Sequence, residues 1–221
     1  MNYNAFHRLL KNRYALSTVV TTLIILVISV LLASVVTYFA INVVSTRVQE
    51  ESLHLTKQHI WLNPAATPGD PGYSLASLMV VNTGGRDIVI DKIAVRGQES
   101  PWKDVDVNGD GKFVVYTITT DPISSDMGFV GTFVAEPEAP VDPEAPALTD
   151  DNVVAFGATN YLLNVATNDL VLPSGSTMIL YIINPDSITI NDIGLTVSIT
   201  LYTAQAMYYR EANVQAYTTV S

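Results

Sequence analysis

The spacing of hydrophobic residues changes once along the chain. Residues 14–46 form a run of 33 positions without a formal charge. A bilayer core needs about 20 apolar residues of helix, so this run is long enough to cross one. Beyond Pro64, apolar and polar residues alternate in short runs that are separated by turn residues, which is the pattern of β-strands. The chain is therefore predicted to be α+β, with a long N-terminal helix and a C-terminal β domain.

The helical pattern continues past the uncharged run to Leu62, where Asn63-Pro64 predicts its end. If this stretch is helical, Leu53 and Ile60 lie on the side of the helix nearly opposite a first row of apolar residues. A helix with two apolar faces is expected to contact its own domain on one side and another molecule on the other. Leu53 and Ile60 are thus candidate assembly contacts, the alternative being isolated exposed apolar residues. The first row of apolar residues consists of Val44, Val48, Leu55 and Leu62.

Short runs that no long amphipathic helix interrupts are typical of an antiparallel β-sandwich or barrel, and of these we expect an Ig-like β-sandwich. Turn residues separate the runs, as in Asn184-Pro185-Asp186. The acidic, proline-rich stretch 135–151 is expected to be a surface loop, or else a binding epitope. The predicted strands are 75–81, 88–95, 113–119, 129–134, 153–156, 161–165, 178–183, 195–202 and 207–216.

Composition narrows the function classes. The 221 residues include no cysteine, which excludes disulfides and thiolate metal sites. With 11 basic and 21 acidic residues the net charge is −10, which argues against nucleic acid as a partner. The three histidines have no catalytic or zinc-like spacing, and no phosphate-binding loop is present. We therefore expect a protein that is not an enzyme, with no catalytic residues and no cofactor-binding residues.

The charges that flank the uncharged run predict its orientation. Arg8, Lys11 and Arg13 precede it without an acidic residue among them, so the positive-inside rule places the N-terminus in the cytoplasm. A cleaved secretory signal has an apolar core of only 7–15 residues, which is shorter than this run. A plain signal anchor remains an alternative.

The segment from Lys11 to Val20 resembles the class III signal peptide of archaeal type IV pilins and archaellins. In that family a basic leader is removed directly before an apolar helix, and the resemblance places the cut between Ala15 and Leu16. It divides the chain into a leader (1–15), a membrane and filament-core helix (16–62) and an extracellular head (63–221). Bacterial type IV pilins usually carry glutamate where this chain has Val20, so the similarity is to the archaeal branch.

The resemblance implies a structural subunit of a surface filament that serves adhesion or motility. Its partners would be copies of itself in a helical homopolymer, a prepilin peptidase and the membrane assembly machinery. The precursor would lie in the plasma membrane with its N-terminus inside, and the assembled subunit would be extracellular. The sequence does not distinguish a subunit of an adhesion pilus from a subunit of an archaellum. The alternatives are a single-pass, membrane-anchored β-sandwich binding protein that does not polymerise, and a minor pilin-like component that captures substrates.

One turn has the composition of half a calcium loop. Asp106, Asn108 and Asp110 stand at its first, third and fifth positions, a glycine follows, and Lys112 could add its backbone carbonyl. Thr117 stands where a bidentate glutamate would be needed. Calcium is thus a possible ligand, and an Asn-Gly/Asp-Gly hairpin turn is the alternative.

Overall fold

The chain folds as two separate units. The computed structural model describes residues 3–48, 50–69, 72–105, 111–130, 133 and 152–217. The units are Met1–Gln49 and Glu50–Ser221, and we call the second the head domain. The expected boundary between residues 62 and 63 is therefore wrong, because the head domain begins at Glu50.

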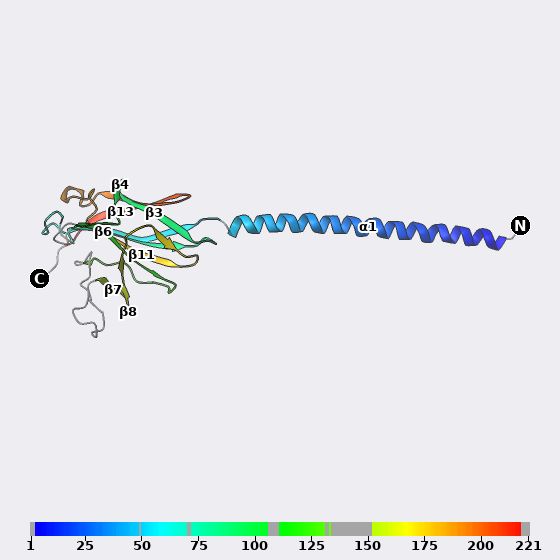
Figure 1. Cartoon of the computed structure of the whole chain (residues 1–221), viewed down its shortest axis with the longest axis horizontal. Helices are drawn as coiled ribbons and strands as arrows, with labels where there is room; N and C mark the ends of the chain where they lie inside the picture. The colour runs from blue at the N-terminus through cyan, green and yellow to red at the C-terminus, as the bar shows by residue number, and fades with distance from the viewer. Residues whose placement is uncertain are drawn as a thin grey trace. The chain divides into compact units, whose positions relative to one another are not determined.

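The first unit is a single helix, α1, from Tyr3 to Val48 (Figure 1). Its sequence contains neither glycine nor proline, so nothing in the backbone chemistry interrupts it. Six of the hydroxyl groups within it donate hydrogen bonds to backbone carbonyls three or four residues earlier, which satisfies these polar groups without water. These side chains are Thr21, Thr22, Ser29, Ser34, Thr37 and Thr46.

The helix does not continue to Leu62 as predicted. It ends at Val48, and the next regular element is strand β1, Leu53–Leu62. β1 pairs with β2, Ser74–Asn82, over most of its length, and its last three residues pair with β13, Met207–Ala216. Pairing and burial within the head domain outweigh the helical spacing of this segment, because strand formation depends more on context than on intrinsic propensity.

The remaining strands are mostly those that the alternating pattern predicts. β2, β3, β6, β7, β11, β12 and β13 each coincide with a predicted strand to within two residues at either end, and the predicted strand 161–165 divides into β8 and β9. Among the described residues of the predicted strand 129–134, none is in a strand. The other bounds are β3 Ile88–Val95, β4 Gln98–Ser100, β5 Lys103–Val105, β6 Gly111–Thr119, β7 Val153–Phe156, β8 Thr159–Leu162, β9 Asn164–Val165, β10 Leu170–Leu172, β11 Thr177–Ile183, the 3-10 turn η2 Ile190–Asp192 and β12 Thr196–Thr203.

One curled sheet forms most of the head domain. Its strand order is β10-β3-β12-β13-β1-β2-β11-β6-β5, with β4 added beside β3 and β9 beside β6. All of these pairs are antiparallel except β1 with β13, which is parallel and joins the two halves of the sheet. The antiparallel β domain is thus confirmed, whereas an Ig-like sandwich of two separate sheets is not. A separate hairpin consists of β7 and β8.

Two hydrophobic cores lie on either side of the central strands. The first is enclosed between the half of the sheet with β2 and β11 and the half with β3, β12 and β13. The second lies on the other face of β2, β6 and β11, against Met127, Phe133 and the β7–β8 hairpin. Figure 1 shows this order, with β3 and β13 on one side of β6 and β11, and β7 and β8 on the other. β2 and β11 are consequently buried on both faces.

Candidate functional site

The most distinctive surface of the described chain is the apolar side-chain layer of α1. Residues Ser17–Thr46 contain an 18-residue window with a mean hydropathy of 2.9, and none of that window is buried. The large side chains here are between 47% (Val27) and 67% (Tyr38) exposed. By length and composition this segment could cross a membrane. An apolar surface of this extent needs a lipid or protein environment, because monomeric soluble proteins rarely expose large contiguous apolar patches.

The expected processing site lies inside this helix. Ala15 and Leu16 both belong to α1, and the backbone on each side of the bond between them is helical. The basic residues of the expected leader belong to the same helix. The role of Ala15 and Leu16 stays a prediction.

Leu53 and Ile60 do not form a second face of a helix. Both lie in β1, with exposed fractions of 8% and 0%, and both belong to the first core of the head domain. Their assignment as exposed assembly contacts is therefore wrong.

A β-bulge explains why the two residues share one core. On a regular strand, residues seven apart point to opposite faces. In β1 the pairing with β2 shifts between Thr56 and His59, so two residues of β1 face one of β2, and Lys57 has a φ of 52°. The extra residue reverses the alternation, and Leu53 and Ile60 point into the same core.

The bulge also directs polar side chains of β1 onto residues 121–130, which we call the strap. The Lys57 ammonium donates to the carbonyl of Ile123, at 2.7 Å, and to that of Ser125. His59 Nε2 lies 3.0 Å from Asp126 Oδ1, and this hydrogen bond is the main reason why the pKa of Asp126 is below its usual value. The strap is thus fastened to the sheet over the second core.

Tyr181 adds a further attachment from β11. Its hydroxyl donates to the carbonyl of Gly128 at 3.1 Å. Burial raises the pKa of this hydroxyl, so Tyr181 stays protonated and able to donate at all physiological pH values.

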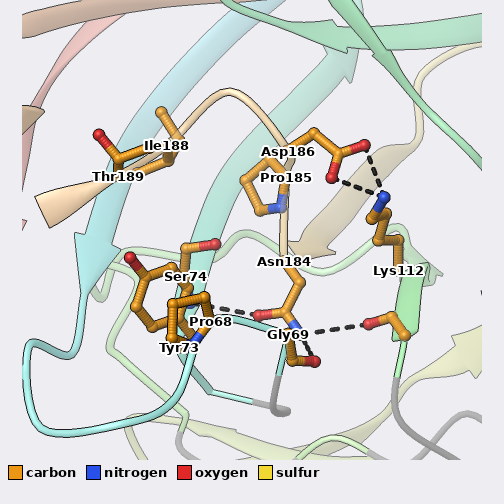
Figure 2. Close-up of a pocket in the computed structure, with 11 residues that line it drawn as sticks. Pro68, Gly69, Tyr73, Ser74, Lys112, Asn184, Pro185, Asp186, Ile188 and Thr189 are labelled. Carbon is orange, nitrogen blue, oxygen red and sulfur yellow. Dashed lines mark hydrogen bonds and ion pairs between the residues drawn. The ribbon is translucent and has the colours of Figure 1, made fainter.

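A pocket of about 400 Å³ opens at the end of the head domain where β1 ends (Figure 2). Asn184 forms part of its wall, has a φ of 49°, and joins three parts of the chain. Its amide nitrogen donates to the carbonyls of Gly69, at 2.8 Å, and Gly111, at 3.2 Å, and its side-chain oxygen accepts from the backbone N–H of Ser74. The lining residues are Pro68, Gly69, Tyr73, Ser74, Gly111, Lys112, Asn184, Pro185, Asp186, Ile188 and Thr189.

An ion pair lies at the edge of this pocket. The Lys112 ammonium is 2.6 Å from Oδ1 and 2.7 Å from Oδ2 of Asp186, and Gln98 also donates to Asp186 at 3.3 Å. Both charged side chains are a little more than one third exposed. On the opposite wall, the hydroxyl and backbone N–H of Thr189, the residue before η2, donate to Asp192, the last residue of η2.

The calcium candidate falls mostly outside the described residues. Asp106, Asn108 and Asp110 are not described, whereas Lys112 lies in β6 and pairs with Asp186. Within the described ranges, no group of three histidine, aspartate or glutamate side chains is placed to hold a metal ion. Calcium binding by this turn stays a prediction.

Sequence reasoning missed both the pocket and the strap. Asn184-Pro185-Asp186 stands out in the sequence only as a turn, and its partners Gly69, Tyr73 and Lys112 lie 70 to 115 positions earlier. No local pattern links these segments, because the sheet topology brings them together.

Comparison with known proteins adds no relationship to these observations. No protein-family model and no curated protein sequence matches the chain.

Proposed function

We propose that this chain is the structural subunit of an archaeal type IV pilus-like surface filament, assembled through α1. The observation that carries the proposal is the apolar surface of Ser17–Thr46, which nothing in the structure covers. The resemblance of the sequence around Ala15 and Leu16 to class III signal peptides supports the same function. Copies of the chain would pack their helices together, with a prepilin peptidase and membrane assembly machinery as transient partners.

The length of the apolar surface favours a filament over a simple anchor. The 30 residues of Ser17–Thr46 span about 45 Å at 1.5 Å per residue, whereas a bilayer core is about 30 Å thick. An anchor would leave several apolar turns without a lipid environment unless the helix tilts strongly. Packing against neighbouring helices would cover the full length.

Apolar burial is sufficient to drive assembly. Removing ten Leu, Ile or Val side chains from water stabilises an assembly by roughly 1.5–3 kcal/mol each, before the costs of association are subtracted. Within Ser17–Thr46 more than ten such side chains are at least half exposed.

The head domain fits this function as a variant of the expected β-sandwich. We propose that the parallel β1–β13 pair joins what would be two sheets into one, because the two halves enclose a single core. The head would stay outside the cell, first on the membrane and then on the filament surface, where adhesion or motility would be its role.

The native N-terminus distinguishes the filament subunit from the anchor. We expect mass spectrometry of the protein from its native cell surface to give a mature chain that starts at Leu16, and electron microscopy to show filaments that contain it. A chain that keeps residues 1–15 and forms no filaments would support the single-pass anchored binding protein instead.

A variant at the junction tests the processing step. Ala15→Asp should leave an uncut, membrane-bound precursor and no filaments, because a charged side chain replaces the small residue before the expected cut. Ala15→Gly is the matched control, and it should be processed and assembled normally. Filaments of normal length from Ala15→Asp would contradict the assigned cut.

A further inference from the structure

The pocket lies at the end of the head domain farthest along β1 from its start at Leu53. It is built where β2 and β6 begin and β11 ends, and these three strands are neighbours in the sheet. β1 runs antiparallel to β2, so this end of the domain is the opposite end from the one that follows α1 in the chain. Its volume of about 400 Å³ lies within the range of small-molecule sites.

The hydrogen bonds of Asn184 make the pocket a fixed shape. Gly69, Gly111 and Ser74 lie in different parts of the chain, and all three form hydrogen bonds with the Asn184 side chain. Asn184 is itself 5% exposed, so it is part of the wall and not a free ligand group. A preformed pocket loses little free energy to ordering when it binds a ligand.

The chemistry of the lining favours an uncharged, hydroxyl-rich ligand. Lys112 and Asp186 present donor and acceptor atoms side by side, and their charges cancel. Both are partly exposed at the edge of the pocket, so their remaining hydrogen-bonding capacity can reach a ligand. Tyr73, Pro68 and Ile188 add apolar surface on the facing walls (Figure 2).

These features disfavour the other ligand classes. The paired charges of Lys112 and Asp186 offer neither an anion nor a cation a net electrostatic attraction. A wholly apolar ligand would strip water from the ion pair without replacing its hydrogen bonds, which is costly. A sugar ring has hydroxyl groups that both donate and accept, and C–H faces that pack on aromatic and proline rings.

We propose that this pocket binds a carbohydrate, either a free saccharide or a glycan attached to a surface. This inference is independent of filament assembly, since the pocket lies wholly within the head domain. A head that binds sugars at this end would present the site away from the residues that follow α1.

The test is a binding measurement on the full chain in a detergent without a sugar headgroup, such as dodecylphosphocholine. The free probes are methyl α-mannoside, methyl α-glucoside, methyl β-galactoside and N-acetylglucosamine at about 10 mM, a concentration that reveals millimolar affinities by saturation-transfer NMR. Inorganic phosphate serves as the anionic comparison. Binding to surface-attached glycans is measured on an array of immobilised glycans. A signal on the array without binding of any free sugar would show that the ligand is an attached glycan and not a free saccharide.

Two variants and a matched control assign the binding to the pocket. Lys112→Met and Asp186→Asn should each weaken sugar binding at least tenfold. Lys92→Met removes a lysine of similar exposure that pairs with Glu99 on β4, and it should leave binding unchanged. Thermal melts of all three variants check folding, and they should lie near that of the unaltered chain, because partly exposed ion pairs contribute about 1 kcal/mol or less.

The outcomes decide the proposal. A sugar or an immobilised glycan that binds to the unaltered chain and to Lys92→Met, but not to the two pocket variants, supports it. Absence of binding to every sugar probe and every glycan overturns it. So do binding that survives in both pocket variants, and phosphate binding in place of sugar binding.

Discussion

At the scale of single residues, Gly84 holds the start of the head domain in place. A Cβ atom at this position would lie 2.8 Å from the Glu50 carbonyl oxygen and 2.9 Å from the Ser52 nitrogen, so only glycine fits here. Its backbone N–H and that of Thr83 both donate to the Ser52 carbonyl. The first residues of the domain are therefore tied to the turn after β2, and only Gln49 separates them from the end of α1.

The contact between Asp126 and His59 gives the strap a pH dependence. The native state holds the pKa of Asp126 below its usual value, chiefly through the hydrogen bond from His59, so the carboxylate favours the folded state. This stabilisation is fully present above the unfolded pKa of about 4 and is lost as the pH falls through the lower folded pKa. Asp126→Asn should therefore lower the melting temperature at pH 7 by about 1–2 °C, as expected for an exposed pair, and by less at pH 3.

Melts of the two proteins across this pH range check the prediction, with Asp121→Asn as the control at an exposed position in the strap. A difference between Asp126→Asn and the unaltered chain that persists undiminished at pH 3 would show that the effect does not come from the charged carboxylate.

At the scale of elements, β-bulges occur in two strands, but only the one in β1 accompanies a wrong prediction. β3 also has an irregular pairing, with β12, and its core residues change from Ile88 and Ile90 to Ile93 and Val95. Its dense β-branched sequence still predicted a strand. In β1 the bulge places core residues seven apart, which is also a helical spacing, and the segment follows a helix without a proline or glycine. The sequence therefore predicted a helix where long-range pairing makes a strand.

The core position of Ile60 leads to a prediction on stability. Ile60 is fully buried, so Ile60→Ala should destabilise the head domain by about 2–5 kcal/mol, through lost apolar contacts and the cavity left behind. Val44→Ala on the exposed part of α1 is the control and should leave the head domain unchanged. Denaturant unfolding of the full chain in detergent, followed by the fluorescence of the nearly buried Trp61, measures both. An unfolding midpoint for Ile60→Ala equal to that of the control would contradict the core assignment.

At the scale of the whole molecule, the division into an apolar helix and a β domain could be predicted because the two parts differ in local amino-acid composition. The uncharged run and the confinement of all glycines and prolines to residues 64–221 are visible without any structure. The curled sheet, the strap and the pocket could not be predicted, since they depend on contacts between distant segments. Lys57 with Ile123 and Ser74 with Asn184 are examples.

The separation into two units predicts that α1 and the head domain respond independently to substitution. Leu31 is 60% exposed in the middle of Ser17–Thr46, and Leu31→Arg should cost about 2.5–3.5 kcal/mol at the centre of a bilayer. We expect alkaline carbonate to release a larger fraction of this variant from membranes than of Leu31→Ile, whereas most of both proteins stays in the membrane fraction. The melting temperature of the head domain should be the same in both. A lowered melting temperature in Leu31→Arg alone would show that the helix contributes to the fold of the head.

The place of β1 within the sheet has a mechanical consequence. Tension on α1 reaches the head domain through β1, which is not an edge strand but lies between β2 and β13. When the far end of the domain is held, such a pull acts along β1 and loads its eight residue pairs with β2 together, in shear. Breaking them at once requires more force than opening them one by one, and the lifetime under load then depends on the unfolding rate and not on equilibrium stability. Optical-trap pulling through α1 should therefore show rupture at higher force than pulling outward on the short edge strand β10. A surface protein with this architecture would carry load through the middle of its sheet.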